Sequence, residues 1–309
     1  MVKVRKFYKQ ASSYLAMERR KRGVDILGRE ICTKEDFIRS FRSQRKGEKT
    51  ASLLDEHDIF PLTYGNPKLA CLNTLGLYVY FSGALTLNGK NQFDASVAGG
   101  RPHQRDLSSL TESELGLKLQ PREKKMKSGE NSYCWYFGEN AGPYARLLSF
   151  MDVHTSYGNA ECIQRKARTG SVLPHYLVYA IDRYENLSKE SKDVCKSLLT
   201  DFVTVCIDTK GSVQKWGKHQ ALNLELLTQP SHNLVYQQGL QILGAISIAY
   251  PEIVIKGDEL FVSRIKSGKS KGKYDGYIRI LADQIPNSLN MPSLEIRMHL
   301  TPACYSFER

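Results

Sequence analysis

The residues that could perform chemistry most directly are two carboxylates with a lysine nearby, Asp152, Glu161 and Lys166. A metal-dependent nuclease needs carboxylates that converge on a metal, with a basic group close by. However, acids and lysines fall at such distances by chance in a chain whose residues are one-quarter charged. The trio therefore supports a metal-dependent nuclease only as an alternative, and we assign no catalytic residue and no metal site from it.

Other catalytic and cofactor-binding signatures fail on context or are absent. Ser263 to Ser270 reads SRIKSGKS, which has Ser where a phosphate-binding loop has its first Gly. That loop also requires a following helix, whereas a strand-like stretch, Tyr274 to Leu281, follows here. The patterns G-x-S-x-G and G-x-G-x-x-G do not occur, and no two of the seven His show the spacing of metal ligands. We therefore predict a non-enzymatic protein without a cofactor.

The composition of the 309 residues indicates a folded, basic protein. A hydrophobic content of 41% is enough for a core, and the net charge of +12 favours a polyanionic partner. Seven Cys without a C-x-x-C pair argue against a disulfide framework or zinc site and suit a reducing compartment. With no secretory signal or apolar spanning stretch, we expect an intracellular protein, cytoplasmic or nuclear, or a virion component.

Most of the excess positive charge lies at the amino terminus. Residues 1–49 hold 15 Lys or Arg and 6 Asp or Glu, a net charge of +9, which leaves +3 for the other 260 residues. Ser12 or Ser13 can cap a helix over 14–22, and Thr33 can cap a second helix over 34–46. Both predicted helices are amphipathic and basic. Their candidate phosphate contacts are Arg19, Arg20, Lys21, Arg22, Arg39, Arg42, Arg45 and Lys46.

A second basic feature is a predicted hairpin near the carboxyl end. Alternating residues at 259–265 and the Tyr- and Ile-rich run at 274–281 predict two strands, and Gly and Ser between them allow a turn. We predict that this turn contacts phosphate or an anionic lipid surface. A solvated loop that protects a sheet edge remains the alternative. The cationic residues of this hairpin are Arg264, Lys266, Lys269, Lys271 and Lys273.

The remaining pattern predicts an α+β protein with a basic helical amino-terminal region on a β-rich body. A division of this body into two β-sandwich-like lobes is compatible with the pattern. We expect strands at 75–81, 133–137, 147–153, 172–181, 203–207 and 221–227, and Ser188 caps a clear helix. Residues 89–131 read mostly as a long polar loop with one short helix near 107–115. The predicted domains are a basic helical region at 1–60, a β-rich lobe at 61–186 with that loop, and an α+β lobe at 187–309 with the lysine-rich hairpin.

The predicted function is binding of a nucleic-acid backbone, RNA in preference to DNA, with little sequence specificity. A basic arm on a β-rich body is also met among viral capsid, nucleocapsid and movement proteins. The alternative is a matrix-type protein that binds anionic membranes and self-assembles, and in both cases we expect a homo-oligomer.

Overall fold

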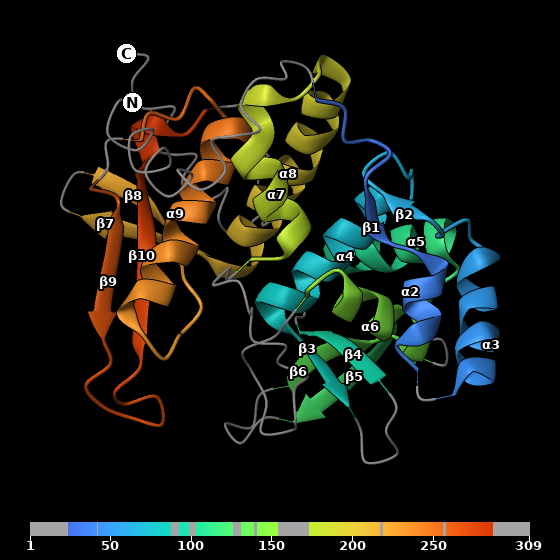
Figure 1. Ribbon diagram of the computed structural model, residues 1–309. Coiled ribbons are helices and arrows are strands. Elements are labelled where there is room, and N and C mark those ends of the chain that lie inside the picture. Colours follow the sequence, from blue (N-terminus) through green and yellow to red (C-terminus); the bar gives the residue numbers. More distant parts are fainter. Residues whose placement is uncertain are drawn as a thin grey trace. The chain divides into compact units, whose positions relative to one another are not determined.

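The computed structural model describes residues 24–41, 43–87, 93–98, 103–125, 131–138, 141–153, 173–216, 219–255 and 258–286. The chain divides into two compact units (Figure 1). The amino-terminal unit comprises Ile26–Arg168 with Pro174–Tyr176, and the carboxy-terminal unit comprises Leu177–Arg309 with Met1–Asp25 and Thr169–Leu173. Helices packed on antiparallel sheets confirm the predicted α+β class. The domain boundaries predicted above stay predictions.

The amino-terminal unit is built on a four-stranded antiparallel sheet in the order β3-β4-β6-β5. Helices α4 and α6 pack on β4, and α4 also contacts β3 and α5. The elements are α4 (Leu69–Ser82), β3 (Gly83–Leu87), β4 (Phe93–Ala98), α5 (His103–Leu115), β5 (Gln120–Lys125), β6 (Asn131–Tyr136) and α6 (Ala141–Phe150). Leu85, Ala95 and Val97 are buried on the helix-covered face of this sheet.

The carboxy-terminal unit repeats this arrangement with strand order β7-β8-β10-β9. Helices α8 and α9 pack against each other; α8 contacts β7 and β8, and α9 contacts β9 and β10 (Figure 1). The elements are α8 (Lys189–Lys210), β7 (Gly211–Trp216), β8 (His219–Glu225), α9 (His232–Ala249), β9 (Leu260–Arg264) and β10 (Tyr274–Leu281), followed by the 3-10 turn η4 (Ala282–Gln284). Helix α7 (His175–Arg183) and the 3-10 turn η3 (Tyr184–Asn186) precede α8.

Both units therefore share one topology of helix, two strands, helix and two strands, with equivalent strand orders. In each, the first helix runs directly into the first strand, at Ser82–Gly83 and at Lys210–Gly211. Gly83 is required at the first junction, because a Cβ there would clash with the carbonyl oxygen of Ser96 and lie 2.7 Å from Val79 Cα. The sequence pattern showed no internal repeat, so this duplication was missed.

Ahead of the repeat, the amino-terminal unit carries an additional pair of helices. They are α2 (Lys34–Arg39) and α3 (Gln44–Asp55), flanked by the two-stranded sheet of β1 (Glu30–Cys32) and β2 (Leu62–Thr63). Thr33 caps α2 by accepting from Asp36 N, as predicted, but the helix expected over 34–46 is interrupted between Ser40 and Ser43.

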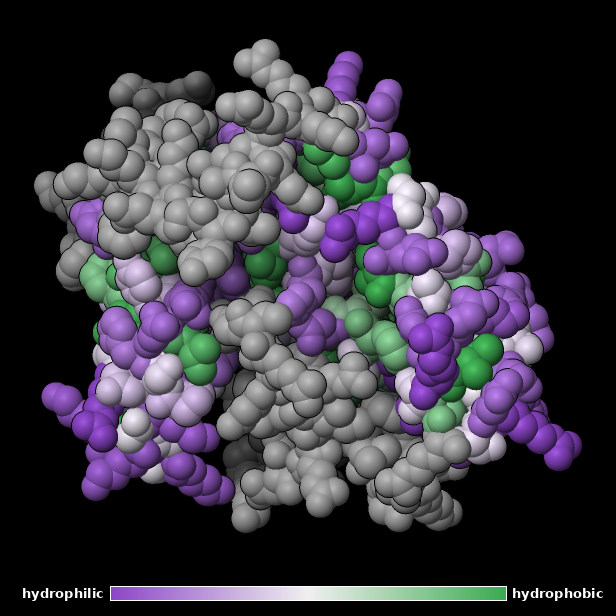
Figure 2. All heavy atoms as spheres, in the orientation of Figure 1, coloured by the Kyte–Doolittle hydropathy of each residue, from purple (hydrophilic) through white to green (hydrophobic). Residues whose placement is uncertain are grey.

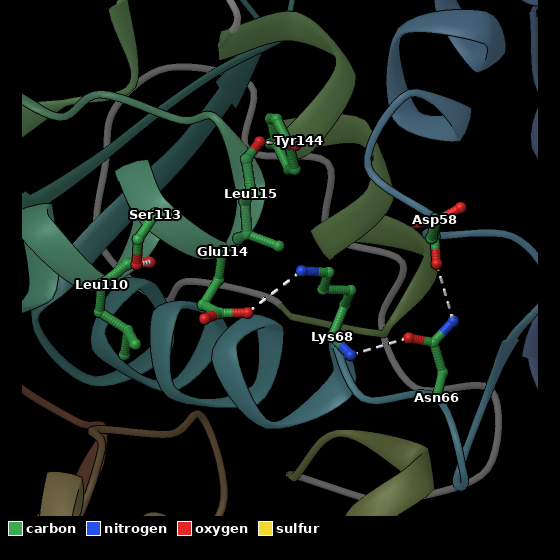
Figure 3. A network of polar contacts seen from close by, with 8 residues as sticks. All are labelled: Asp58, Asn66, Lys68, Leu110, Ser113, Glu114, Leu115 and Tyr144. Atoms are coloured by element: carbon green, nitrogen blue, oxygen red, sulfur yellow. Dashed lines mark hydrogen bonds and ion pairs between the residues drawn. The ribbon is translucent and has the colours of Figure 1, made fainter.

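A polar network around Asn66 fixes the start of α4 (Figure 3). Asn66 Nδ2 donates to the carbonyl oxygens of Asp58 (3.2 Å), Ile59 (3.1 Å) and Pro61 (3.1 Å). Its Oδ1 accepts from Lys68 N at 2.8 Å, immediately before the helix. Lys68 Nζ also forms an ion pair of 3.1 Å with Glu114 Oε2, which joins α4 to α5.

We predict that Asn66→Ala lowers the free energy of unfolding by about 1–3 kcal/mol, because three carbonyl oxygens and one N–H lose their partner together. The midpoint of thermal unfolding, followed by circular dichroism, should fall by roughly 3–10 °C. Asn66→Asp keeps the acceptor for Lys68 N but turns a carboxylate oxygen towards three carbonyl oxygens, so its midpoint should also fall below that of the wild type. Equal midpoints for Asn66→Ala and the wild type would contradict this role.

Four predicted strands are helical in the structure. Residues 75–81 lie in α4, 147–150 in α6, 175–181 in α7 and 203–207 in α8. In α4 the signal was misread because residues 75–81 are all buried, so β-branched and aromatic residues recur without the polar face that marks a helix. Conversely, the loop predicted over 89–131 contains β4 and β5, while the short helix expected in it near 107–115 is present as α5. Neither unit is a β-sandwich in the described strands, since each four-stranded sheet packs on helices.

Candidate nucleic-acid interface

An ordered cationic hairpin joins β9 to β10. Ile265 N donates to Lys273 O and Gly272 N donates to Ile265 O, both at 2.9 Å, which closes the turn. Gly268 and Gly272 adopt φ of 77° and 88°, a region that favours glycine. Hydrophilic side chains gather over this hairpin at the lower left of the view (Figure 2). The five predicted cations of the hairpin are exposed, and no ion pair joins them to a carboxylate among the residues described.

The same two strands form part of a polar sheet face. Gly276 and Leu260 lie against α9, because a Cβ on Gly276 would lie 3.2 Å from Val235, and one on Gly239 would contact Leu260. Alternate residues point to the other face, where paired positions bring Ser212, Asn223 and Arg279 into one row and Glu225, Tyr277 and Phe261 into the next. The β7–β10 sheet therefore has an apolar helix face and an opposite face with hydrogen-bonding groups.

Arg279 is the centre of contacts on this opposite face. Its guanidinium lies 4.9 Å from the ring centroid of Phe261, and its Nη2 donates to Tyr277 Oη at 3.0 Å. Nε donates to Asn223 Oδ1 at 3.4 Å. The rings of Phe261 and Tyr277 stack with centroids 4.8 Å apart. These contacts hold a guanidinium and two aromatic rings in fixed positions on one face of the sheet, with the Asn223 amide buried beneath the guanidinium.

Lys210 is the last residue of α8, which packs on this sheet. Burial lowers the pKa of its ammonium group, and the nearby Glu225 carboxylate opposes that shift.

The β3–β6 sheet of the amino-terminal unit carries a related face. The register places Ala84, Ser96, Tyr136 and Gln120 in one row, and Arg122 opposite Cys134 in a neighbouring row. The Arg122 guanidinium lies 4.7 Å from the ring centroid of Tyr136. Gln120 and Arg122 are exposed. In both units, therefore, an arginine stacked on a tyrosine lies on the sheet face that the buried apolar residues leave free.

The contact residues predicted from sequence have different outcomes. Arg19, Arg20, Lys21, Arg22 and Arg42 lie outside the described residues. Arg39 is exposed in the last turn of α2 and forms an ion pair of 3.4 Å with Asp36. Arg45 and Lys46 are exposed in the first turn of α3. These three belong to the amino-terminal unit and the hairpin cations to the carboxy-terminal unit, so the single contact face predicted for them stays a prediction.

The sheet-face residues Phe261, Tyr277 and Arg279 were missed as candidates, although the signal for them was present. Strict alternation along 259–265 and 274–281 predicts which side chains share a face. The lysines of the turn carry the stronger charge signal, whereas the alternate positions of the strands determine the face.

Only Asp152 of the carboxylate trio lies within the described residues. Asp152 has a φ of 63° and lies 3.7 Å from His175 Nε2, while Glu161 and Lys166 fall outside the described residues. Across the described ranges, no group of three or more His, Cys, Asp and Glu is placed to hold a metal ion. Nor does any described helix have the length and apolarity to span a membrane.

Three cysteines are part of the core. Cys71, Cys195 and Cys206 are buried with free thiols, and burial raises the pKa of each to about 12. Such thiols stay protonated and unreactive.

No family model matches the chain, and no curated protein matches it. Among solved structures, the chain is similar to the homing endonuclease I-WcaI bound to its DNA recognition sequence, with a TM-score of 0.39 and 11% identity over 75% of this chain and 85% of that chain. It is also similar to the homing endonuclease I-DmoI in complex with DNA and Mn, with a TM-score of 0.32 and 11% identity over 76% of this chain and 94% of that chain.

These comparisons correct the predicted class of protein. The prediction of a non-enzymatic protein is wrong by this finding, because the solved structures to which the chain is similar are homing endonucleases, which are enzymes. The viral structural class, the matrix-type alternative, the preference for RNA and the homo-oligomer have no counterpart among them.

Proposed function

We propose that this protein binds double-stranded DNA, with its sheet faces against the bases and the lysine hairpin along the phosphate backbone. The observation that carries the proposal is that β9 and β10 supply both the surface that would face the bases and the turn that would follow the phosphates. Phe261, Tyr277 and Arg279 lie on the face of these strands, and the exposed lysines lie in the turn that joins them. Lysines neutralise phosphates, whereas forked side chains read base edges.

The chemistry of the sheet face suits a major groove. A two-stranded β-ribbon fits a groove of about 12 Å, where arginine pairs with guanine and asparagine with adenine through two hydrogen bonds. In A-form RNA the major groove is too deep and narrow for side chains to read. Arg279, which the buried Asn223 holds in place, therefore favours duplex DNA over duplex RNA, the reverse of the preference predicted from sequence.

The experiment that tests the proposal is binding of the full chain to a 30-base-pair DNA of mixed sequence, by fluorescence anisotropy, at several salt concentrations. If lysines and arginines contact phosphates, log K should fall linearly with log salt, by about 0.9 for each phosphate neutralised. Duplex RNA of the same sequence should bind more weakly. Strand cleavage is followed on gels in parallel reactions with Mg²⁺. A flat salt dependence, or no binding at 50 mM salt, would contradict the proposal.

We predict that Arg279→Lys reduces the preference between sequences without changing the salt dependence. The lysine retains the charge but loses the fork that reads two acceptors, which is worth about 1–3 kcal/mol, or roughly 5- to 150-fold in discrimination. The measurement is selection from a randomised duplex library, followed by affinities for the best site and for a scrambled site. As the matched control, Arg183→Lys changes an arginine stacked on Tyr179 outside both sheets. An unchanged preference in Arg279→Lys would exclude base contact by this residue.

A further inference from the structure

The helix pair α2–α3 lies outside the duplicated topology and presents a basic surface of its own. We propose that Arg45, Lys46 and Lys49 on α3 form a second contact with the phosphate backbone of the duplex, separate from the sheet faces. This proposal rests on the proposed function, since it concerns the same ligand.

The pair is held rigidly by aromatic packing. Phe37 of α2 is fully buried, with its ring centroid 5.4 Å from Phe41, 5.3 Å from Phe60 and 6.1 Å from Phe150. Arg146 of α6 places its guanidinium 3.9 Å from the ring centroid of Phe41. The same guanidinium donates to the carbonyl oxygen of Ser40 at 3.0 Å and to its Oγ at 3.1 Å. The turn between the helices is therefore fixed to the body of the unit.

The two helices also pack closely against each other. A Cβ on Gly47 would lie 2.9 Å from the carbonyl oxygen of Ile38, so the backbones of α2 and α3 approach each other at this glycine. An ion pair between Lys34 and Asp55 joins the start of α2 to the end of α3. Because these contacts fix the side of α3 that faces α2, the exposed side of α3 also has a defined position.

Burial on α3 divides its residues into two sides. Gly47, Ala51 and Leu54 recur at helical spacing and are buried. The three basic residues 45, 46 and 49 are exposed on other positions of the helix. Arg45 and Lys49 lie one turn apart, with Cβ atoms about 5–6 Å from each other, and Lys46 adjoins them. Three cations within one turn can therefore reach neighbouring phosphates of one strand.

The carboxylates of α3 are engaged elsewhere. Glu48 Oε1 accepts from Gln44 Nε2 at 2.9 Å, and Asp55 pairs with Lys34. No ion pair joins Arg45, Lys46 or Lys49 to a carboxylate in the part of the chain that the structure describes. Like charges one helical turn apart repel each other, at a cost of a few tenths of a kcal/mol. An anionic backbone would remove that repulsion, whereas the core of the unit gains nothing from these three residues.

The test is the variant Arg45→Gln/Lys46→Gln/Lys49→Gln in the full chain, measured on the 30-base-pair DNA against salt. Loss of three phosphate contacts should reduce the slope of log K against log salt by roughly 2–3, since each contact contributes about 0.9. At 100 mM salt, Kd should rise about 10- to 100-fold. The matched control is Lys118→Gln/Lys189→Gln/Lys196→Gln, which removes the same charge from exposed lysines in the α5–β5 connection and on α8; of these, Lys118 pairs with Glu112.

The outcomes separate this proposal from the proposed function. Wild-type binding with an unchanged slope in the α3 variant, or an equal loss in the control, overturns the α3 contact and leaves the sheet faces in place. If the wild type does not bind DNA, both the α3 contact and the proposed function are contradicted. Flotation with vesicles that contain 30% phosphatidylserine covers the lipid alternative. Vesicle binding that the α3 variant loses, together with unchanged DNA binding, assigns this face to membrane and overturns the proposal. Thermal unfolding at the wild-type midpoint confirms that the variant is folded.

Discussion

Replacement of Lys266, Lys269, Lys271 and Lys273 by Gln should weaken DNA binding by about 100- to 1,000-fold at 100 mM salt. These side chains are exposed on a hairpin whose backbone is fixed by its own hydrogen bonds. Four fewer phosphate contacts should reduce the slope of log K against log salt by up to about 3.6. Fluorescence anisotropy on the 30-base-pair duplex measures both quantities.

The hairpin variant has a conservative counterpart. Substitution of the same four positions by Arg keeps the charge and should retain the salt slope. Because Gly268 and Gly272 are unchanged, both variants should unfold at the wild-type temperature. Equal affinity for the Gln and Arg variants would show that the hairpin is only a solvated edge of the sheet.

Gly83→Ala should lower the free energy of unfolding by about 2–4 kcal/mol, one of the largest effects expected of any single methyl group in this chain. The added Cβ would meet backbone atoms, the Ser96 carbonyl oxygen and Val79 Cα, which cannot rotate away as a side chain can. Urea unfolding followed by circular dichroism measures the change.

The control for this substitution is Gly28→Ala, because no heavy atom lies within 4 Å of a Cβ at that position. It should change the free energy of unfolding by less than about 0.5 kcal/mol. A similar loss in both variants would contradict a steric clash at Gly83 as the cause, because Gly→Ala without a clash should be neutral or slightly stabilising.

Helices and strands were predicted correctly from the sequence where the pattern is amphipathic or where a capping residue lies next to the helix. Ser188 accepts from Ser191 N at the start of α8, and the two strands around the lysine turn were predicted by their alternation. Burial on all sides removed that information elsewhere. In α4, residues 75–81 are all buried, and a run such as LGLYVYF has the composition of a strand when no polar face marks the helical period.

The candidate site was predictable in its charges but not in its sheet face. Lys266 and Lys269 are recognisable in the sequence because they belong to a group of lysines in one turn rich in Gly and Ser. Asn223 and Arg279 meet only through the pairing of β8 with β10, which are separated by a helix and another strand. No local pattern encodes that register, so their juxtaposition needed the fold.

Duplication within one chain also bears on the symmetry of the ligand. A dimer of identical subunits presents the same surface twice and so selects palindromic sites. Here the two related sheet faces carry different side chains, with Gln120 and Arg122 on one and Asn223 and Arg279 on the other. If each sheet contacts half of a duplex, the two preferred half-sites should differ in sequence. A palindrome built from either half-site should then bind less tightly than a duplex that combines the two different half-sites.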